Sequence, residues 1–337
     1  MNSTIHSISK LFLLIAFAVV STSSVFAQTF PDITTISDQK PGSVLIFNYY
    51  TSNPSNRDRE DTQIHITNTH LQKAGSVAIY FIDSVAGAVS DGYICLAPNQ
   101  MISFRASDVD PGGKGYILVV SVDAAGHPNK FNYFTGSESI KTADGYQAML
   151  NAEAISALVE SPTAPPPGEI GNGIVATLKF DGVRYNKLPG ALELDYIPAM
   201  RDGNKTMVIV NQIGGSLFGE RTPDNLNGLA GNVYGPDAMP YFWQEGNINS
   251  FQFRKVISNS FPQTSPNMGT LIKQGGWYGW MKFWPVNANK GVTGVVLYLN
   301  DSTLPYTYNT NFNGGRNLHH TSLTTDELSI PITAPAC

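Results

Sequence analysis

A stretch rich in proline and glycine, Ser161–Gly173 (SPTAPPPGEIGNG), interrupts this chain near its middle. It holds four of the 21 prolines and three glycines within 13 residues. Consecutive prolines lack N–H donors and favour extended polyproline geometry, so neither a helix nor a central strand can run through them. Segments with strand-like patterns lie on both sides. The stretch therefore predicts a linker, at 161–173, between two domains at 28–160 and 174–337.

The first 27 residues have the pattern of a secretory signal peptide. Lys10 precedes an apolar run, Leu11–Val20, which is too short to span a bilayer as a helix. Residues 25–27 (VFA) fit the small-x-small rule, so cleavage before Gln28 is expected. We therefore expect a secreted, periplasmic or cell-surface protein without a transmembrane segment.

The charge of the mature chain limits its partners. Without the first 27 residues the chain has 310 residues (337 − 27), and without Lys10 it has 20 basic against 26 acidic residues, a net charge of −6. No basic cluster longer than two residues is present. Electrostatic attraction to nucleic acid or to anionic lipid is therefore not expected.

Short strand-like segments fill both halves. Asp61–Thr69 alternates apolar and polar residues, and Gly115–Asp123 (GYILVVSVD) and Lys205–Gln212 (KTMVIVNQ) are rich in β-branched residues. Strands this short, at this spacing, predict a mostly β protein with one β-sandwich in each half.

One segment departs from that pattern. Asp144–Val159 (DGYQAMLNAEAISALV) has no proline, contains several alanines among good helix formers, and has apolar residues spaced three apart from Met149 to Leu158. That spacing predicts one helix before the linker, with Asp144 as its N-cap.

Several segments are similar to a group of exported bacterial proteins of unknown function: GSVLIFNYYTS, QIHITNTH, the segment from SDGYICLAPNQ to VVSVDAAG, and NLHHTSLTT. The resemblance covers most of the mature chain and implies a bacterial source and a secreted or cell-surface location. It supplies no catalytic residues. More loosely, each half resembles the immunoglobulin-like sandwiches of bacterial surface proteins, although the buried Trp between two bridged cysteines is absent.

The tryptophans are clustered. All four lie between Trp243 and Trp284, and one segment reads WYGWMKFW. On a strand, Tyr278, Trp280 and Trp284 share one face. That face either forms an exposed row that stacks sugar rings or a partner's apolar surface, or it is buried in a central strand, which is the more common arrangement. Tyr278, Trp280, Trp284 and Trp243 are the candidate ligand-binding residues.

Two pairs of acidic residues are weaker candidates. Asp108 and Asp110, in DVDPGG, offer two carboxylates to Ca²⁺, which needs six to eight oxygen ligands. An Asp-Pro-Gly turn explains the same residues. Glu193 and Asp195 share a strand face, as a carboxylate pair of a hydrolase would, but no third group is in view. No other cofactor is indicated.

The chain has two cysteines, Cys95 and Cys337. Disulfides persist in the compartments to which a signal peptide leads, so one intramolecular bond between them is one alternative. The other is that Cys95 is a buried apolar residue.

The sequence contains no G-x-S-x-G or H-E-x-x-H motif. The first hypothesis is therefore an exported, non-enzymatic surface or extracellular protein that binds a ligand or has a structural role, the partner being a glycan or a surface protein. The alternative is a carbohydrate-binding protein that uses the aromatic strand of its second domain. A hydrolase of extracellular polymers ranks lowest.

Overall fold

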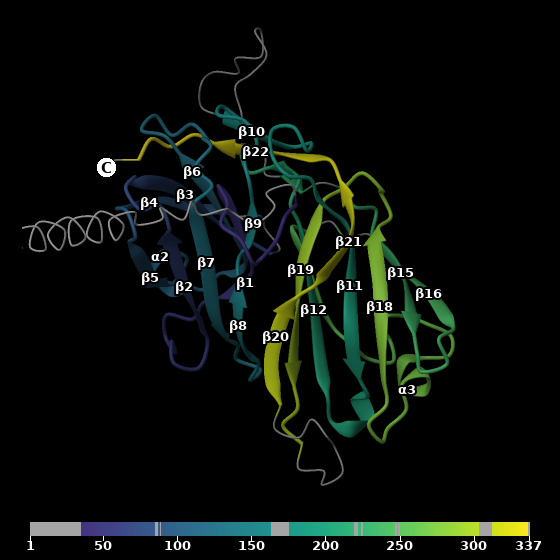
Figure 1. Cartoon of the computed structure of the whole chain (residues 1–337). Helices are drawn as coiled ribbons and strands as arrows, with labels where there is room; N and C mark the ends of the chain where they lie inside the picture. Colours follow the sequence, from purple (N-terminus) through teal and green to yellow (C-terminus); the bar gives the residue numbers. More distant parts are fainter. Residues whose placement is uncertain are drawn as a thin grey trace, which may run out of the picture. The chain divides into compact units, whose positions relative to one another are not determined.

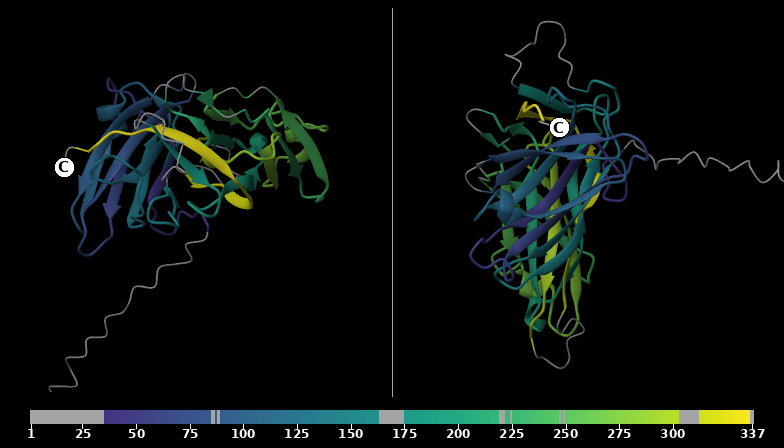
Figure 2. Two further views of the ribbon diagram at one scale, coloured as in Figure 1. Left: turned by 90° about the horizontal axis from the view of Figure 1, so that it is seen from above. Right: turned by 90° about the vertical axis from the view of Figure 1, so that its left-hand side faces the viewer.

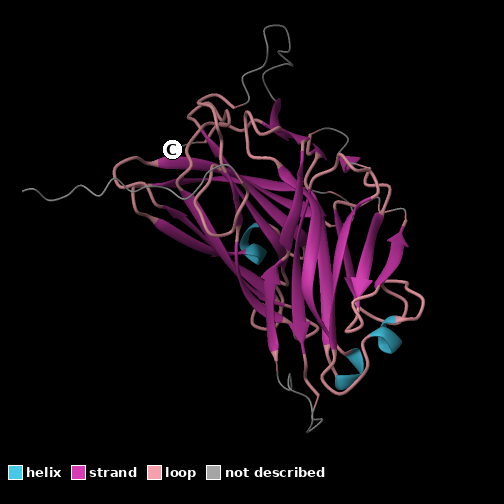
Figure 3. Ribbon diagram, turned by 45° about the vertical axis from the view of Figure 1, so that its right-hand side comes forward, coloured by secondary structure: helices cyan, strands magenta, loops and turns pink. Residues whose placement is uncertain are grey.

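The structure is a computed structural model that describes residues 35–337, apart from 85, 86, 88, 163–174, 219–221, 224, 247, 249, 303–311, 336 and 337. The predicted signal peptide and nearly all of the predicted linker lie outside the described residues and stay predictions. The described residues belong to one compact unit, Ile33–Cys337. Strands dominate it, and its helices are single turns: α2 Ala106–Val109, the 3₁₀ turn Met200–Asp202, and α3 Met268–Leu271 (Figure 3).

Two sheets come from the first half of the chain. Sheet I has the strand order β4-β3-β6-β1-β9, with β1 Val44–Thr51, β3 Gly75–Asp83, β4 Val89–Leu96, β6 Lys114–Val122 and β9 Glu153–Ile155. Sheet II has the order β5-β2-β7-β8, with β2 Asp61–Asn68, β5 Met101–Arg105, β7 Phe134–Lys141 and β8 Gln147–Asn151.

Three sheets come from the second half. Sheet III has the order β10-β22-β13-β14, with β10 Val175–Phe180, β13 Gly215–Ser216, β14 Thr222–Pro223 and β22 Asp326–Pro331. Sheet IV has the order β17-β12-β19-β20, with β12 Lys205–Gln212, β17 Gln252–Val256, β19 Val292–Leu299 and β20 Asn313–Asn317. Sheet V has the order β16-β15-β18-β11-β21, with β11 Leu188–Pro198, β15 Leu229–Tyr234, β16 Pro240–Glu245, β18 Tyr278–Pro285 and β21 His319–Thr324.

Strand β1 shows why its sequence is largely apolar, with Asn48 and Thr51 as its polar exceptions. Its eight residues are all buried. Leu45 and Phe47 belong to a core that sheet I shares with sheet II, whereas Val44 and Ile46 belong to a core that sheet I shares with sheet III. A strand covered on both faces has no position at which a polar side chain reaches water.

The two halves of the chain share hydrophobic cores. Leu178 and Leu328 of sheet III pack in one core with Leu118 of sheet I. Leu150 of sheet II packs in another core with Ile209 of sheet IV. Strands β8 and β20, from different halves, lie side by side (Figure 1), and the yellow C-terminal strands lie between first-half and second-half strands (Figure 2). Neither half buries its apolar residues alone.

The prediction of a mostly β protein is confirmed, but the prediction of two β-sandwich domains in tandem, each immunoglobulin-like, is wrong. The chain forms five small sheets in one compact unit, not two separate domains. Strand patterns identify strands but do not show which sheets share a core. The prediction failed because sheet III, built after the proline-rich stretch, covers sheet I, built before it.

The predicted helix at 144–159 is also wrong. This segment forms β8 and β9, and β8 pairs with β7. Along β8, Ala148 and Leu150 are buried while Met149 is 76% exposed, which is the alternation of a strand. The alanines favour a helix locally, but pairing with β7 supplies the backbone hydrogen bonds and a core for every second side chain.

None of the helices among the described residues is long and apolar enough to cross a membrane.

Candidate functional site

The outer side of sheet V carries a group of aromatic side chains. Along β18, Tyr278 is 62% exposed and Trp280 and Trp284 are partly exposed, whereas Met281 and Phe283 between them are buried. The face of β18 that carries Tyr278, Trp280 and Trp284 was expected to be buried, but in the structure it faces the solvent. We call the set Tyr234, Phe242, Tyr278, Trp280 and Trp284 the aromatic face.

Strand register brings residues from neighbouring strands to the same face. Tyr234 of β15 lies directly opposite Trp280, and their rings stack with centroids 4.1 Å apart and planes 8° apart. Phe242 of β16, which is 61% exposed, lies opposite Asn232 of β15. Paired residues project from the same side of a sheet, so these aromatic rings form one surface.

Polar side chains cross the middle of the aromatic face. In register, Lys282 of β18 lies between Asn232 of β15 and Glu193 of β11. All three side chains are partly exposed. The row supplies an amide, an ammonium and a carboxylate between the two tryptophans of β18, so the face offers hydrogen-bonding groups as well as rings.

Trp243, the fourth candidate ligand-binding residue, is not part of this face. It is only 2% exposed and lies in the core between sheets IV and V. Its ring packs edge-on against Phe261, with centroids 5.6 Å apart. Trp243 and Phe242 are neighbours on one strand and therefore point to opposite sides of it.

Asp108 and Asp110, the candidate calcium ligands, are engaged with different protein groups. Asp108 Oδ1 pairs with Arg57 Nη1 at 2.6 Å. Asp110 accepts hydrogen bonds from the hydroxyls of Tyr50 and Ser90, both at 2.6 Å. Within the described ranges, no group of three His, Cys, Asp or Glu side chains is placed to hold a metal ion. The structure therefore places these two residues in a hydrogen-bonded turn.

Cys95 lies on β4 and is disulfide-bonded rather than free. Cys337 lies outside the described residues, so the bond between Cys95 and Cys337 stays a prediction.

Glu193 and Asp195, the weak hydrolase candidates, have different surroundings. Asp195 forms an ion pair with Arg316, and its Oδ2 lies 3.3 Å from His319 Nε2. Glu193 belongs instead to the polar row that crosses the aromatic face. The structure brings no third carboxylate to them among the residues it describes, and the hydrolase hypothesis gains no support.

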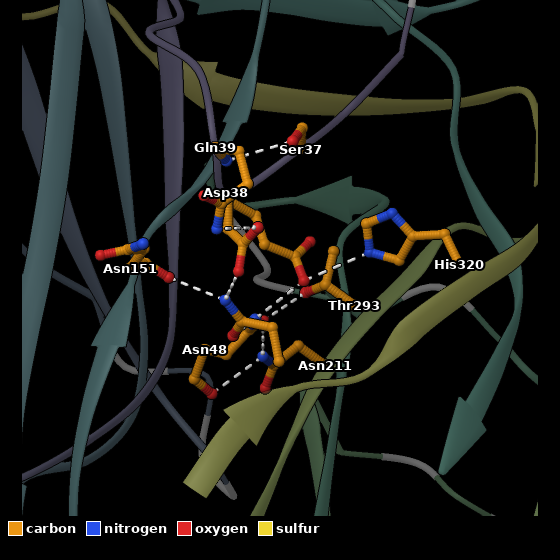
Figure 4. A network of polar contacts seen from close by, with 10 residues as sticks. Ser37, Asp38, Gln39, Asn48, Asn151, Asn211, Thr293 and His320 are labelled. Atoms are coloured by element: carbon orange, nitrogen blue, oxygen red, sulfur yellow. Dashed lines mark hydrogen bonds and ion pairs between the residues drawn. The ribbon is translucent and has the colours of Figure 1, made fainter. Parts of the chain in front are cut away.

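A buried polar network joins the two halves of the chain, and nothing in the sequence indicated it (Figure 4). Asn48 of β1 donates hydrogen bonds to Glu153 Oε1 of β9, at 3.2 Å, and to Asn317 Oδ1 of β20, at 2.9 Å. Its own Oδ1 accepts hydrogen bonds from Asn211 of β12, at 3.0 Å, and from Thr293 of β19, at 2.7 Å. Asn48 is 1% exposed, so the network holds sheets I and IV together away from water.

A histidine lies at the edge of this network. His320 Nε2 lies 3.3 Å from Glu153 Oε1. Burial lowers the pKa of His320, but the charges of Glu153 and Asp38 and the hydrogen bond to Glu153 together raise that pKa above its usual value. The protonated imidazolium is therefore favoured beside a carboxylate that is 1% exposed.

A second buried carboxyl group, Glu138 of β7, has no such partner. It is 1% exposed, and no side chain in the described part of the chain hydrogen-bonds to its carboxyl oxygens. Burial raises the pKa of Glu138 well above its ordinary value and outweighs the lowering effect of the backbone N–H of Tyr49, so the neutral acid is favoured.

The sequence missed two members of the aromatic face, Tyr234 and Phe242. Tyr234 lies in the glycine-rich segment 214–235, which has no clear strand pattern, and Phe242 lies 35 residues before the segment WYGWMKFW. The alternation Tyr241, Phe242, Trp243 was the available signal, since it places Phe242 opposite to its two neighbours.

The chain matches no known family model, and a comparison with curated proteins found no match. Among solved structures, it is similar to the crystal structure of Thermotoga maritima 1070, with 12% identity over 34% of this chain and 92% of that one, and a TM-score of 0.26. It is also similar to Bacteroides uniformis beta-glucuronidase 2 covalently bound to cyclophellitol-6-carboxylate aziridine, with 11% identity over 83% of this chain and 25% of that one, and a TM-score of 0.14. At these TM-scores neither structure carries an argument about fold or function.

Proposed function

We propose that this protein is an exported, non-enzymatic binding protein and that its aromatic face binds a linear glycan. The observation that carries the proposal is the exposure of Tyr278 and Phe242, at 62% and 61%, beside the partly exposed Trp280 and Trp284. Large aromatic side chains left together on a surface usually mark a binding site.

The spacing of the rings along β18 suits an extended ligand. Successive side chains on one face of a strand are about 7 Å apart, so Tyr278 and Trp280 are that far apart and Trp280 and Trp284 are about 14 Å apart. A chain of sugar rings that follows the strand meets these aromatic rings in turn. Aromatic rings offer flat apolar faces to the C–H faces of sugars at little cost in conformational entropy.

The polar row distinguishes a glycan from an apolar protein surface. Asn232, Lys282 and Glu193 interrupt the aromatic residues in the middle of the face. Burying these groups under an apolar partner leaves their hydrogen-bonding capacity unsatisfied, which costs free energy. Sugar hydroxyls both donate and accept hydrogen bonds and so satisfy all three.

The location of the protein also fits a glycan ligand. The signal-peptide pattern in the first 27 residues directs the chain out of the cytoplasm, and the net charge of −6 in the mature chain (20 basic against 26 acidic residues) disfavours nucleic acid and anionic lipid. Neutral or weakly charged extracellular polysaccharides remain as abundant extended ligands.

A panel of linear hexasaccharides tests the proposal, with calorimetry on the mature protein as the measurement. The panel contains cellohexaose, xylohexaose, mannohexaose, maltohexaose and chitohexaose. We expect at least one to bind, and we expect the double variant Tyr278→Ala/Phe242→Ala to bind it about tenfold more weakly, a difference of about 1.4 kcal/mol. Both side chains are largely exposed, so the double variant should melt at the temperature of the wild type.

Tyr93→Ala is the matched control, because Tyr93 is 42% exposed on β4 of sheet I, outside the aromatic face. Its affinity should equal that of the wild type. Absence of binding to every hexasaccharide, or equal affinity of the double variant and the wild type, contradicts the proposal.

A further inference from the structure

The outer side of sheet II carries two adjacent cavities, with volumes of about 330 Å³ and about 290 Å³. His65 of β2 lines both of them. Ligand pockets in proteins usually span about 300–1,000 Å³, so each cavity is near the lower end of that range. The pair is suited to a small ligand that lies across His65.

Polar side chains of β2 and β7 form the floor of the two cavities. On β2 the residues that alternate with His65, Ile64 and Ile66, are fully buried, so His65 and Thr67 project outward. On β7 the outward side chains before Lys141 bear hydroxyls, and the strand register places Thr135 opposite Thr67 and Ser137 opposite His65. We call the set His65, Thr67, Thr135, Ser137 and Ser139 the polar trough.

The trough residues have unused hydrogen-bonding capacity. Among the described residues, no hydrogen bond involves the ring of His65 or the hydroxyls of Thr67, Thr135, Ser137 or Ser139. Neighbouring side chains are engaged: Gln63 Nε2 donates to Ser103 Oγ at 2.5 Å. The five side chains of the polar trough therefore line the cavities with donor and acceptor groups that are not hydrogen-bonded to one another. A ligand that offers both donors and acceptors satisfies them together.

The walls contain charged side chains that balance one another. Arg57, in the wall of the smaller cavity, pairs with Asp108 at 2.6 Å, and Arg105 lies 3.9 Å from Asp58. Lys141 of β7 lies opposite Asp61 of β2 in the strand register, and the carboxylate of Asp61 accepts hydrogen bonds from Ser107. Arg57, Arg105 and Lys141 are thus accompanied by three nearby aspartates, so the smaller cavity has little net charge to attract an anion or a cation.

The wall of the larger cavity is fixed by the polar network between the halves. Asp38 lines that cavity, and its Oδ2 accepts a hydrogen bond from Asn317 Nδ2 at 3.2 Å. Asn317 Nδ2 also donates to the backbone oxygen of Asn151, a second lining residue, at 2.8 Å. A wall held by these hydrogen bonds keeps its shape before a ligand arrives, which lowers the entropic cost of binding.

We propose that the polar trough is a second saccharide-binding site, which takes a neutral unit of one or two sugar rings through hydrogen bonds rather than by stacking. Hydroxyl groups spaced around a sugar ring match the alternating donors and acceptors of β2 and β7. Met149 of β8, which lines the smaller cavity and is 76% exposed, offers the apolar contact that a sugar's C–H groups need. The site is independent of the aromatic face, since the two lie on different sheets.

The test measures disaccharide binding to a variant whose aromatic face has been disabled. The mature chain with Tyr278→Ala/Phe242→Ala is titrated with cellobiose, maltose, lactose and sucrose, and with inorganic phosphate, and binding is followed by NMR. We expect at least one disaccharide to bind and phosphate not to bind. Adding His65→Ala to this double variant should lower its affinity for that disaccharide by about tenfold, which corresponds to about 1.4 kcal/mol.

Two further variants separate the role of the trough from a folding defect. Thr67→Val keeps the shape of the side chain, favours a strand and removes one hydroxyl, so it should weaken binding by about threefold to tenfold with an unchanged melting temperature. His127→Ala is the control, since His127 is an exposed histidine beside Asp123 that lines neither cavity. It should leave affinity unchanged.

Three results overturn the proposal: no disaccharide binds, phosphate binds in their place, or His65→Ala binds disaccharide as tightly as His127→Ala. If no hexasaccharide binds to the aromatic face, these results still stand, because the disaccharide titrations use a variant in which that face is disabled.

Discussion

The indole ring of Trp280 stacks on the phenol ring of Tyr234, with centroids 4.1 Å apart and planes 8° apart. The pair joins the neighbouring strands β15 and β18 on the outer side of sheet V. One face of Trp280 is therefore covered by protein, and only the rest of the side chain is available to a ligand. Trp280 has both a structural and a binding role. Tyr278, two residues away, also packs against Tyr196, with ring centroids 6.0 Å apart, but it is 62% exposed and its role is mainly in binding.

Replacing these two residues should separate the roles. Trp280→Ala is expected to lower the free energy of unfolding by about 2 kcal/mol, because it removes an aromatic pair worth about 0.5–1.5 kcal/mol and some buried area. Tyr278→Ala is expected to change it by less than about 0.5 kcal/mol. Urea denaturation measures both. A loss of about 3–5 kcal/mol for Trp280→Ala would mean that the ring is a core residue.

The network around Asn48 should be strongly stabilising. Asn48→Ala is expected to lower the free energy of unfolding by about 3 kcal/mol, because Glu153, Asn211 and Thr293 lose hydrogen-bond partners in a buried region. Asn56→Ala, at an exposed loop position, is the control and should change it by less than about 0.5 kcal/mol. Equal losses for the two variants would show that the network does not hold the halves together.

Stability should depend on pH through His320. Its folded-state pKa is raised by Glu153 and Asp38 against the opposing effect of burial. A raised histidine pKa gives stability that is fully present below the unfolded pKa of about 6.5 and is lost as pH rises through the folded pKa. His320→Gln should remove this dependence, so the wild type should exceed the variant in melting temperature by more at about pH 5.5 than at about pH 8.5. A pH-independent difference would contradict the ion pair.

Glu138 should also make the protein less stable as pH rises, but because of its burial rather than an ion pair. Burial raises its pKa, so the wild type loses stability as pH rises above the unfolded carboxyl pKa of about 4.3 and through the folded one. Glu138→Gln cannot ionise. Its melting temperature relative to the wild type should therefore increase from about pH 5 to about pH 8. A constant difference would mean that the carboxyl group has a partner when charged.

The individual strands of this fold can be predicted from local sequence patterns, whereas the packing of its sheets cannot. The alternation Ile64, His65, Ile66 predicted β2, and the β-branched residues of Gly115–Asp123 predicted β6, because side-chain period and composition are local properties. Which sheets share a core is not local. Leu118 of sheet I and Leu178 of sheet III belong to one hydrophobic core although the proline-rich stretch separates them in sequence.

The candidate site was predicted in part. The alternation along β18 placed Tyr278, Trp280 and Trp284 on one face, as the structure does. Whether that face is covered depends on partners distant in sequence, and the favoured expectation of burial did not hold. The network around Asn48 and the polar trough depend on residues from separate strands, and none of them belongs to a recognisable motif.

Acrylamide quenching of tryptophan fluorescence tests the glycan-binding account most directly. It is measured on the wild type with and without the hexasaccharide that binds most tightly by calorimetry. The account predicts that bound hexasaccharide lowers quenching because it shields the partly exposed Trp280 and Trp284, and that a Trp280→Phe/Trp284→Phe variant loses most of this protection. A hexasaccharide that binds the wild type and leaves its quenching unchanged would contradict the account, because the ligand would then occupy a site other than the aromatic face.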